Sequence, residues 1–387
     1  MKVYKTVASF TVIDMFLDIG QLLQNNSDIG MIIQTLFSLS FIIYLFYAQR
    51  IQAMTMLRQI EGTLRKVKNI RDEGRKVSIE TVKEIGKPVN DPTPDVDRLI
   101  ESFIIGPVSL DPAGIVGKLD QLLNVRDDTF LEDVRIIAPQ ATEVEAHNIE
   151  NLIEAASALN SYYKAIRHFY LLGKKTMNIY VIMQIHMILP MIIKEIEATS
   201  SAIQAFRNGM PIGDGVGALV AAKLMRGHEW RDTAKEMVMA EVPYEGRTLI
   251  VVKAKGPGGS VGKPGDAIEK ILNEDTEKKV KAVIMIDAAG KLEGEPTGGI
   301  AEGIGAAIGG VGVEKYKIEE SVKRHEIPMY AIAIKQDISH VIAPMVEELH
   351  KATDKALESV KRIVMNRTKE GDWILVAGIG NTMGIAQ

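Results

Sequence analysis

The chain has 387 residues, which is enough for two or three domains, and its formal net charge is −4. This charge gives no electrostatic basis for binding nucleic acid, and the absence of cysteine excludes disulfides, thiolate metal ligands and a cysteine nucleophile. Hydrophobic residues make up 46% of the chain, and its mean hydropathy of +0.05 is high for a wholly soluble protein. The composition therefore directs attention to membrane segments.

The first strong signal along the chain is a transmembrane helix at residues 29–49. This stretch carries no charge and is flanked by Asp28 and Arg50. About 20 residues at about 1.5 Å each cross a hydrocarbon core about 30 Å thick. Basic residues are more frequent after the stretch than before it, so the positive-inside rule places the bulk of the chain in the cytoplasm. We expect a single-pass protein of the cell membrane, with lipid as one partner.

Two other apolar segments are less suited to span a bilayer. Residues 7–23 contain Asp14 and Asp18, so we expect an amphipathic helix that lies at the membrane interface. Residues 177–193 contain polar side chains such as His186, which favours a helix buried within a helical domain or between protomers. A second crossing at 177–193 is the alternative, and it would move the chain after it to the opposite side.

The pattern divides the chain into four regions. We expect the amphipathic segment and transmembrane helix at 1–50, a basic helix and linker at 51–97, a helical domain at 98–236 and an α/β domain at 237–387. Asp214 lies in a glycine turn of the helical region, where a helix cap is the expected role.

The α/β region is recognised by a change of period. Short apolar runs rich in isoleucine and valine begin at Thr248, Lys281, Pro328 and Trp373, and helical patterns separate them at 264–274, 314–325 and 338–367. Strands that alternate with helices predict a mostly parallel sheet with helices on both faces.

A glycine-rich loop, KGPGGSVGKPGD, follows the first of these runs. It is not a Walker A motif, because Pro257 stands where the first glycine belongs and Pro264 where serine or threonine is required. Glycine N–H groups before a helix can still bind an anion or nucleotide. The candidate anion ligands are Gly258, Gly259, Ser260, Gly262 and Lys263. A purely structural turn is the alternative, since Asp266 at a cap position would satisfy the same donors.

Carboxylates follow the second apolar run, among many glycines. Carboxylates near the end of a strand suit Mg²⁺, which prefers hard oxygen ligands, or they can perform acid–base chemistry. The candidate metal ligands are Asp287, Glu293, Glu295 and Glu302. The seven histidines form neither HxxxH nor HExxH, so the sequence does not support a zinc site. The small residues of GIAEGIGAAIGG would permit close contact between subunits, and we expect a homo-oligomer.

Two resemblances extend this interpretation. GPGGSV resembles the glycine loop of the Clp and signal-peptide-peptidase class of serine proteases, but the segment after the next strand has Thr297 and no serine nucleophile. A protease of that class, or its inactive relative, is therefore a secondary alternative.

The motifs SLDPAGIV, PIGDGVGALVA, KGPGGSVGKPGDAIEKIL, KLEGEPTGGIAEGIGAAIGG and GIGNTMGI together resemble an archaeal membrane-protein family. That family is catalogued as a numbered domain of unknown function. The resemblance covers nearly the whole chain and implies an archaeal cell membrane and a one-span architecture, without an assigned activity. A self-assembling membrane scaffold, ring or cage without catalysis is the main alternative to a ligand-binding protein, and whether the chain is an enzyme stays open.

Overall fold

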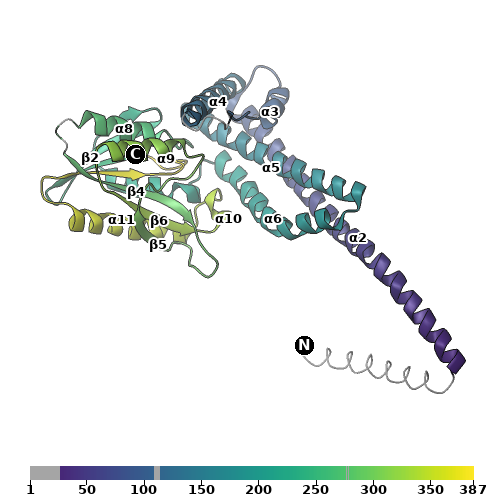
Figure 1. Ribbon diagram of the computed structural model, residues 1–387. Helices are drawn as coiled ribbons and strands as arrows, with labels where there is room; N and C mark the ends of the chain where they lie inside the picture. Colours follow the sequence, from purple (N-terminus) through teal and green to yellow (C-terminus); the bar gives the residue numbers. More distant parts are fainter. Residues whose placement is uncertain (1–26, 109–113, 276, 278) are drawn as a thin grey trace. The chain divides into compact units, whose positions relative to one another are not determined.

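The computed structural model describes residues 27–108, 114–275, 277 and 279–387 (Figure 1). The chain divides into two compact units. The first contains the described residues up to Leu64 together with Ile166–Leu189, and the second contains the described residues of Arg65–Ala165 and Pro190–Gln387. The predicted interfacial helix at residues 7–23 lies outside the described residues.

The first half of the chain is helical, as predicted. Its helices are α2 (Ser27–Thr81), α3 (Thr93–Ile100), α4 (Ile115–Ile137), α5 (Glu143–Thr176) and α6 (Ile179–Arg207). A π-helical turn, Val82–Gly86, ends the basic helix. The linker predicted to end the 51–97 region is short, because α3 already begins at Thr93 with Pro94 in its first turn.

The beginning of α2 carries an uncovered apolar surface. Among its described side chains, Met31, Phe37 and Tyr44 are between 57% and 62% exposed. Two helices of the described residues, α2 and α6, are long and apolar enough to cross a membrane. In α6 one face is buried, and His186 Nε2 lies 2.7 Å from Gln59 Oε1 within the first unit. His186, the polar residue that made a second membrane crossing at 177–193 less suitable, therefore has a hydrogen-bonding partner.

The second half of the chain forms one seven-stranded sheet. Its strands are β1 (Trp230–Ala234), β2 (Met237–Tyr244), β3 (Arg247–Ala254), β4 (Val280–Gly290), β5 (Ile300–Ile304), β6 (Met329–Gln336) and β7 (Trp373–Gly378). Their order is β1-β2-β3-β7-β4-β6-β5. The central pairs β3–β7, β7–β4 and β4–β6 are parallel, and the flanking pairs are antiparallel. The sheet is therefore mixed, with the predicted parallel strands at its centre.

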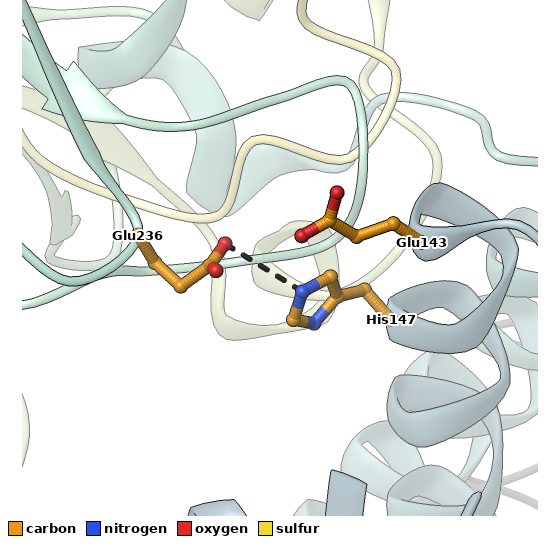
Figure 2. Close-up of side chains that lie close together, drawn as sticks. All are labelled: Glu143, His147 and Glu236. Carbon is orange, nitrogen blue, oxygen red and sulfur yellow. Dashed lines mark ion pairs between the residues drawn. The ribbon is translucent and has the colours of Figure 1, made fainter. Parts of the chain in front are cut away.

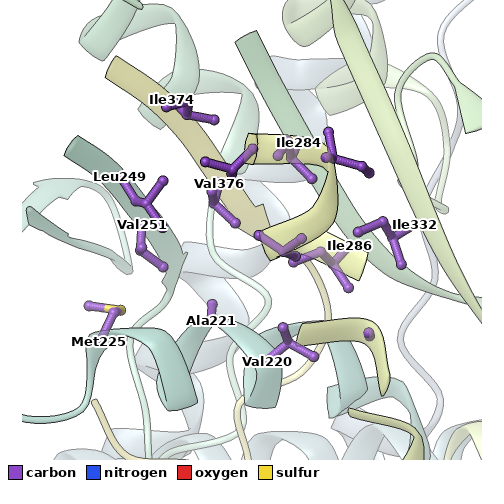
Figure 3. Packing of buried hydrophobic residues seen from close by; sticks show 14 of the residues in the cluster. Val220, Ala221, Met225, Leu249, Val251, Ile284, Ile286, Ile332, Ile374 and Val376 are labelled. Carbon is purple, nitrogen blue, oxygen red and sulfur yellow. The ribbon is translucent and has the colours of Figure 1, made fainter. Parts of the chain in front are cut away.

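Helices cover both faces of this sheet, as predicted. On one face lie α7 (Val216–Met225) and α11 (Glu347–Arg367), and on the other lie α8 (Pro264–Glu274) and α9 (Val313–Arg324). Leu249 and Val251 point into the first layer (Figure 3), while Ile250 and Val252 belong to the second. Burial on both faces explains why the central strands are continuous apolar runs rather than alternating ones.

The structure differs from the sequence-based division of the chain in three places. The predicted boundary at 236/237 separates β1 from β2, although the two strands pair. The sheet domain begins earlier, because the apolar helix α7 packs on the sheet and β1 is its first strand. The predicted helix at 338–367 is divided into α10 (Ile338–Val341) and α11, with Pro344 between them. The strands β1, β2 and β5 were not expected; all three form antiparallel pairs at the flanks of the sheet.

Candidate functional site

A cavity of about 370 Å³ lies at the carboxyl ends of the parallel strands. Segments that follow β3, β4 and β7 form its walls, together with the end of β6 and part of α4. Open α/β sheets bind ligands at this edge, because the loops that leave the strands converge there. The apolar part of the lining includes Leu123, Val261, Ile308, Val311, Val341 and Ile379.

Of the four predicted metal ligands, Asp287 is the one that lines this cavity. It lies near the end of β4 and is 8% exposed. Its Oδ1 accepts a hydrogen bond from the Ala288 N–H at 2.7 Å, and its Oδ2 accepts one from the Gly309 N–H at 3.2 Å. Burial, and then the nearby carboxylate of Asp214, raise the pKa of Asp287 to about 7. The group can therefore gain and lose a proton near neutral pH.

Asp214 reaches the same cavity from the turn before α7. The predicted role as a helix cap is wrong, because the N-cap residue is Gly215 and no side chain caps α7. Instead, Asp214 Oδ2 accepts a hydrogen bond from the Asn381 N–H at 2.8 Å. Burial raises the pKa of Asp214 as well. Two carboxyl groups in one apolar cavity disfavour each other's ionisation.

Gln336 is the third polar group of the cavity, and sequence reasoning did not identify it. Its side chain is fully buried at the end of β6, and neither Oε1 nor Nε2 has a hydrogen-bond partner. A buried amide without partners costs free energy, and a ligand in the cavity would supply the missing donor and acceptor. A periodic strand pattern marks this position as buried but gives no sign that its amide faces a cavity.

The predicted anion loop is held by bonds within the protein. Gly259 N–H donates to Asn148 Oδ1, Gly262 N–H donates to Ser260 Oγ, and Lys263 Nζ lies 3.3 Å from Asp127 Oδ2. The helix cap expected from Asp266 is also absent, since the Gly265 N–H donates to Glu314 Oε2 while Asp266 pairs with Lys317. These donors are therefore already committed, although the side chain of Lys263 lines the cavity.

The four predicted metal ligands are not gathered into one site. Glu295 pairs with Lys335, Glu302 pairs with Arg362, and Glu293 is exposed. Among the residues that the structure describes, they do not form a group of three or more ligands close enough to share an ion. Glu293 and Glu295 lie in the loop that follows β4, and Glu302 lies on β5, so none of these three glutamates lines the cavity that contains Asp287.

A different group does have the arrangement of a metal site (Figure 2). It consists of Glu143 and His147 on α5 and of Glu236 in the β1–β2 turn. Their ligand atoms all lie within 4.8 Å of one another. The sequence offered no motif for it, because two ligands come from a helix and the third from a hairpin far along the chain.

Two family models together match nearly the whole chain. Residues 34–209 match the N-terminal domain of DUF1512, a protein of unknown function, and residues 212–386 match the DUF1512 C-terminal domain of unknown function. The boundary between the models lies just before α7, in agreement with the structural assignment of that helix to the sheet. Comparisons with curated proteins and with solved structures found no match. The predicted resemblance to a numbered domain-of-unknown-function family is confirmed.

Proposed function

The chain belongs to the DUF1512 family, and we propose that its C-terminal domain binds a small neutral or cationic molecule and exchanges a proton with it through Asp287. The observation that carries this proposal is the pair Asp214 and Asp287 in one largely apolar cavity, beside the unpartnered amide of Gln336. A carboxyl group with a pKa of about 7 has the proton affinity that general acid–base chemistry requires at neutral pH.

The lining favours a ligand with an apolar body and a hydroxyl or amino group. The amide of Gln336 offers an NH₂ donor group and a carbonyl acceptor, and a carboxylate accepts hydrogen bonds from a hydroxyl or amine. An anionic ligand such as a nucleotide is less suitable, because two carboxyl groups face the cavity and the loop donors bond within the protein.

Magnesium is the second candidate occupant of the same cavity. Asp214, Asp287 and the Oε1 atom of Gln336 are hard oxygen ligands of the kind that Mg²⁺ binds. Bound Mg²⁺ would keep both carboxyl groups ionised, whereas an amine or hydroxyl ligand would share a proton with Asp287. The pH dependence of binding therefore separates the two occupants.

We place this site in a membrane-anchored protein whose bulk is cytoplasmic and which assembles as a homo-oligomer. The uncovered apolar surface of α2 supports the anchor, and the basic residues that follow the apolar stretch support the orientation. The small residues after β4 support contacts between copies. The scaffold alternative gives no account of the buried carboxyl pair, and the protease alternative has no serine in the segment between β4 and β5, where the nucleophile would have to lie.

A thermal-shift screen of the full-length protein tests the proposal. Small amines and alcohols, small anions and MgCl₂ are compared at several pH values, with Asp287→Asn as the site variant and Glu319→Gln, on the exposed side of α9, as the control. We expect amines or alcohols to stabilise the wild type and the control but not Asp287→Asn, with a pH midpoint near 7. Hits confined to anions, or hits unaffected by Asp287→Asn, would overturn the proposal.

A further inference from the structure

Helix α5 aligns three acidic or imidazole side chains on one face. Glu143, His147 and Glu150 are four and three residues apart, so they follow one another along the same side of the helix. His147 is only 7% exposed. Its Nδ1 lies 3.2 Å from Glu150 Oε2. Because an ionised carboxylate only accepts, Nδ1 carries the hydrogen and donates it.

The other ring nitrogen of His147 has no hydrogen-bond partner although it is buried. With the hydrogen on Nδ1, the Nε2 lone pair faces the carboxylates of Glu143 and Glu236, which only accept hydrogen bonds (Figure 2). A lone pair facing carboxylates is unfavourable unless a cation lies between them. The arrangement therefore requires positive charge at this point.

The spacing fits a metal ion better than a proton. His147 Nε2 lies 3.5 Å from Glu236 Oε2. An imidazolium donating to a carboxylate would normally bring these atoms to about 2.7–2.9 Å. Two ligands at about 2.0–2.2 Å from a tetrahedral ion are about 3.4 Å apart. The observed separation matches the second geometry.

The third ligand is held in place by the sheet. Glu236 occupies a two-residue turn between β1 and β2, and its carbonyl accepts a hydrogen bond from the Lys255 N–H at 2.9 Å. Nearby basic side chains pair with other carboxylates. These pairs are Lys235 with Asp128, Lys255 with Asp232, and Lys263 with Asp127.

We propose that Glu143, His147 and Glu236 bind a divalent first-row transition metal ion, with Glu150 orienting the imidazole. A carboxylate that accepts the second ring N–H is the usual support of a metal-bound histidine. One imidazole and two carboxylates suit ions such as Zn²⁺ better than Mg²⁺ or Ca²⁺, which take oxygen ligands alone.

Three protein ligands leave a coordination position open. His147 and Glu236 line a cavity of about 350 Å³, which is also lined by polar side chains such as Asn151 and Asn381. Water or a small ligand can therefore reach the ion, as in metal sites that act on a bound molecule. The segment Val261–Lys263 lines both this cavity and the one that contains Asp287. The metal site is thus separate from the carboxyl pair but shares a wall with it.

The test is a Zn²⁺ titration of chelator-treated, full-length protein by calorimetry, in excess Mg²⁺ to suppress weak sites. We expect one Zn²⁺ per chain, loss of this binding in His147→Ala and Glu236→Gln, and a decrease of about 10–100-fold in affinity in Glu150→Gln. His168→Ala, an exposed histidine on the same helix, is the matched control and retains binding. Substitution with Co²⁺ adds an optical readout of tetrahedral ligands.

Glu236→Gln keeps the size of the side chain, so its circular dichroism and metal-free melting should equal those of the wild type. Absence of Zn²⁺ binding by the wild type would mean that a protonated His147 supplies the positive charge, and the proposal would be wrong. Unchanged affinity in His147→Ala would equally overturn it, because the ion would then lie elsewhere.

Discussion

Asp214 and Asp287 line one cavity from two distant segments of the chain, the turn before α7 and the end of β4. Each carboxylate accepts a backbone N–H, which favours ionisation, yet burial and their mutual repulsion leave the pKa of Asp287 raised to about 7. Ionising both carboxyl groups in this buried cavity costs free energy. A bound proton, a cation or a hydrogen-bonding ligand would lower that cost.

Replacing Asp287 by asparagine should stabilise the protein in a pH-dependent way. The raised pKa means that the wild type is most stable when Asp287 is protonated and loses stability as the pH rises from about 4 to about 7. The full difference is about 4 kcal/mol at 1.36 kcal/mol per pKa unit, less the cost of one backbone N–H that asparagine leaves unpaired. The melting temperatures of wild type and Asp287→Asn, measured from pH 4 to 8, check this.

The melting temperatures of the two proteins should be nearly equal near pH 4 and differ by several degrees above pH 7. A constant difference over the whole range would mean that folding does not raise the pKa of Asp287, contrary to its buried position in this cavity.

Asp214→Asn should lower the pKa of Asp287, because it removes a nearby negative charge. Burial remains, so the pKa should stay above its ordinary value of 3.8. The measurement is the pH at which half of the pH-dependent loss of stability has occurred. This midpoint should lie at a lower pH in Asp214→Asn than in the wild type. No movement would show that the two carboxyl groups do not interact.

Thr382 should be essential for the shape of the glycine-rich loop. Its hydroxyl is fully buried, 3.0 Å from the carbonyl oxygens of Lys255, Gly258 and Ser260. Thr382→Val removes this shared donor and should cost about 1–3 kcal/mol, whereas Thr382→Ser keeps the hydroxyl and should cost less. Amide hydrogen exchange of the loop should increase in the valine variant only. Equal exchange in the two variants would contradict this role.

Gly378, at the end of β7, should not tolerate a side chain. A Cβ atom there would overlap the Gly217 carbonyl and come within 2.5 Å of Ala221 Cβ on α7. Gly378→Ala should therefore destabilise the sheet domain by about 1–3 kcal/mol or more. Gly117 on α4 has open space around it, so Gly117→Ala is the control and should be neutral or slightly stabilising. Thermal unfolding compares the two, and equal midpoints would refute the close packing of α7.

Two arginines at Phe37 and Ser38 should release the protein from membranes. Phe37 is 57% exposed on α2, in the middle of the uncharged stretch. Each arginine at the centre of a span costs about 2.5–3.5 kcal/mol. The fraction of protein that sediments with membranes after an alkaline wash measures the effect, with arginines at the exposed Glu277 and Glu319 as control. Unchanged sedimentation of the Phe37/Ser38 variant would exclude this helix as the anchor.

Much of the fold was predictable because the hydrophobic pattern of each segment agrees with its burial in the folded domain. The central strands are buried on both faces, so their sequences are short apolar runs that differ clearly from the helices between them. The flanking strands β1 and β2 escaped prediction, because a partly exposed antiparallel hairpin shows neither a continuous apolar run nor a strict alternation. The role of α7 also escaped, since its apolar residues would suit a helical bundle equally well.

The sequence by itself determined the helical first half, the uncharged stretch of α2, the order of the central strands and helices along the chain, and the position of Asp287 near the end of a strand. These features depend on residues adjacent in the chain. Only the tertiary structure decided that Asp214 and Gln336 join Asp287, that the glutamates after β4 point elsewhere, and that His147 meets Glu236. A site requires side chains to converge in space, and that convergence depends on how distant segments pack, which no local spacing encodes.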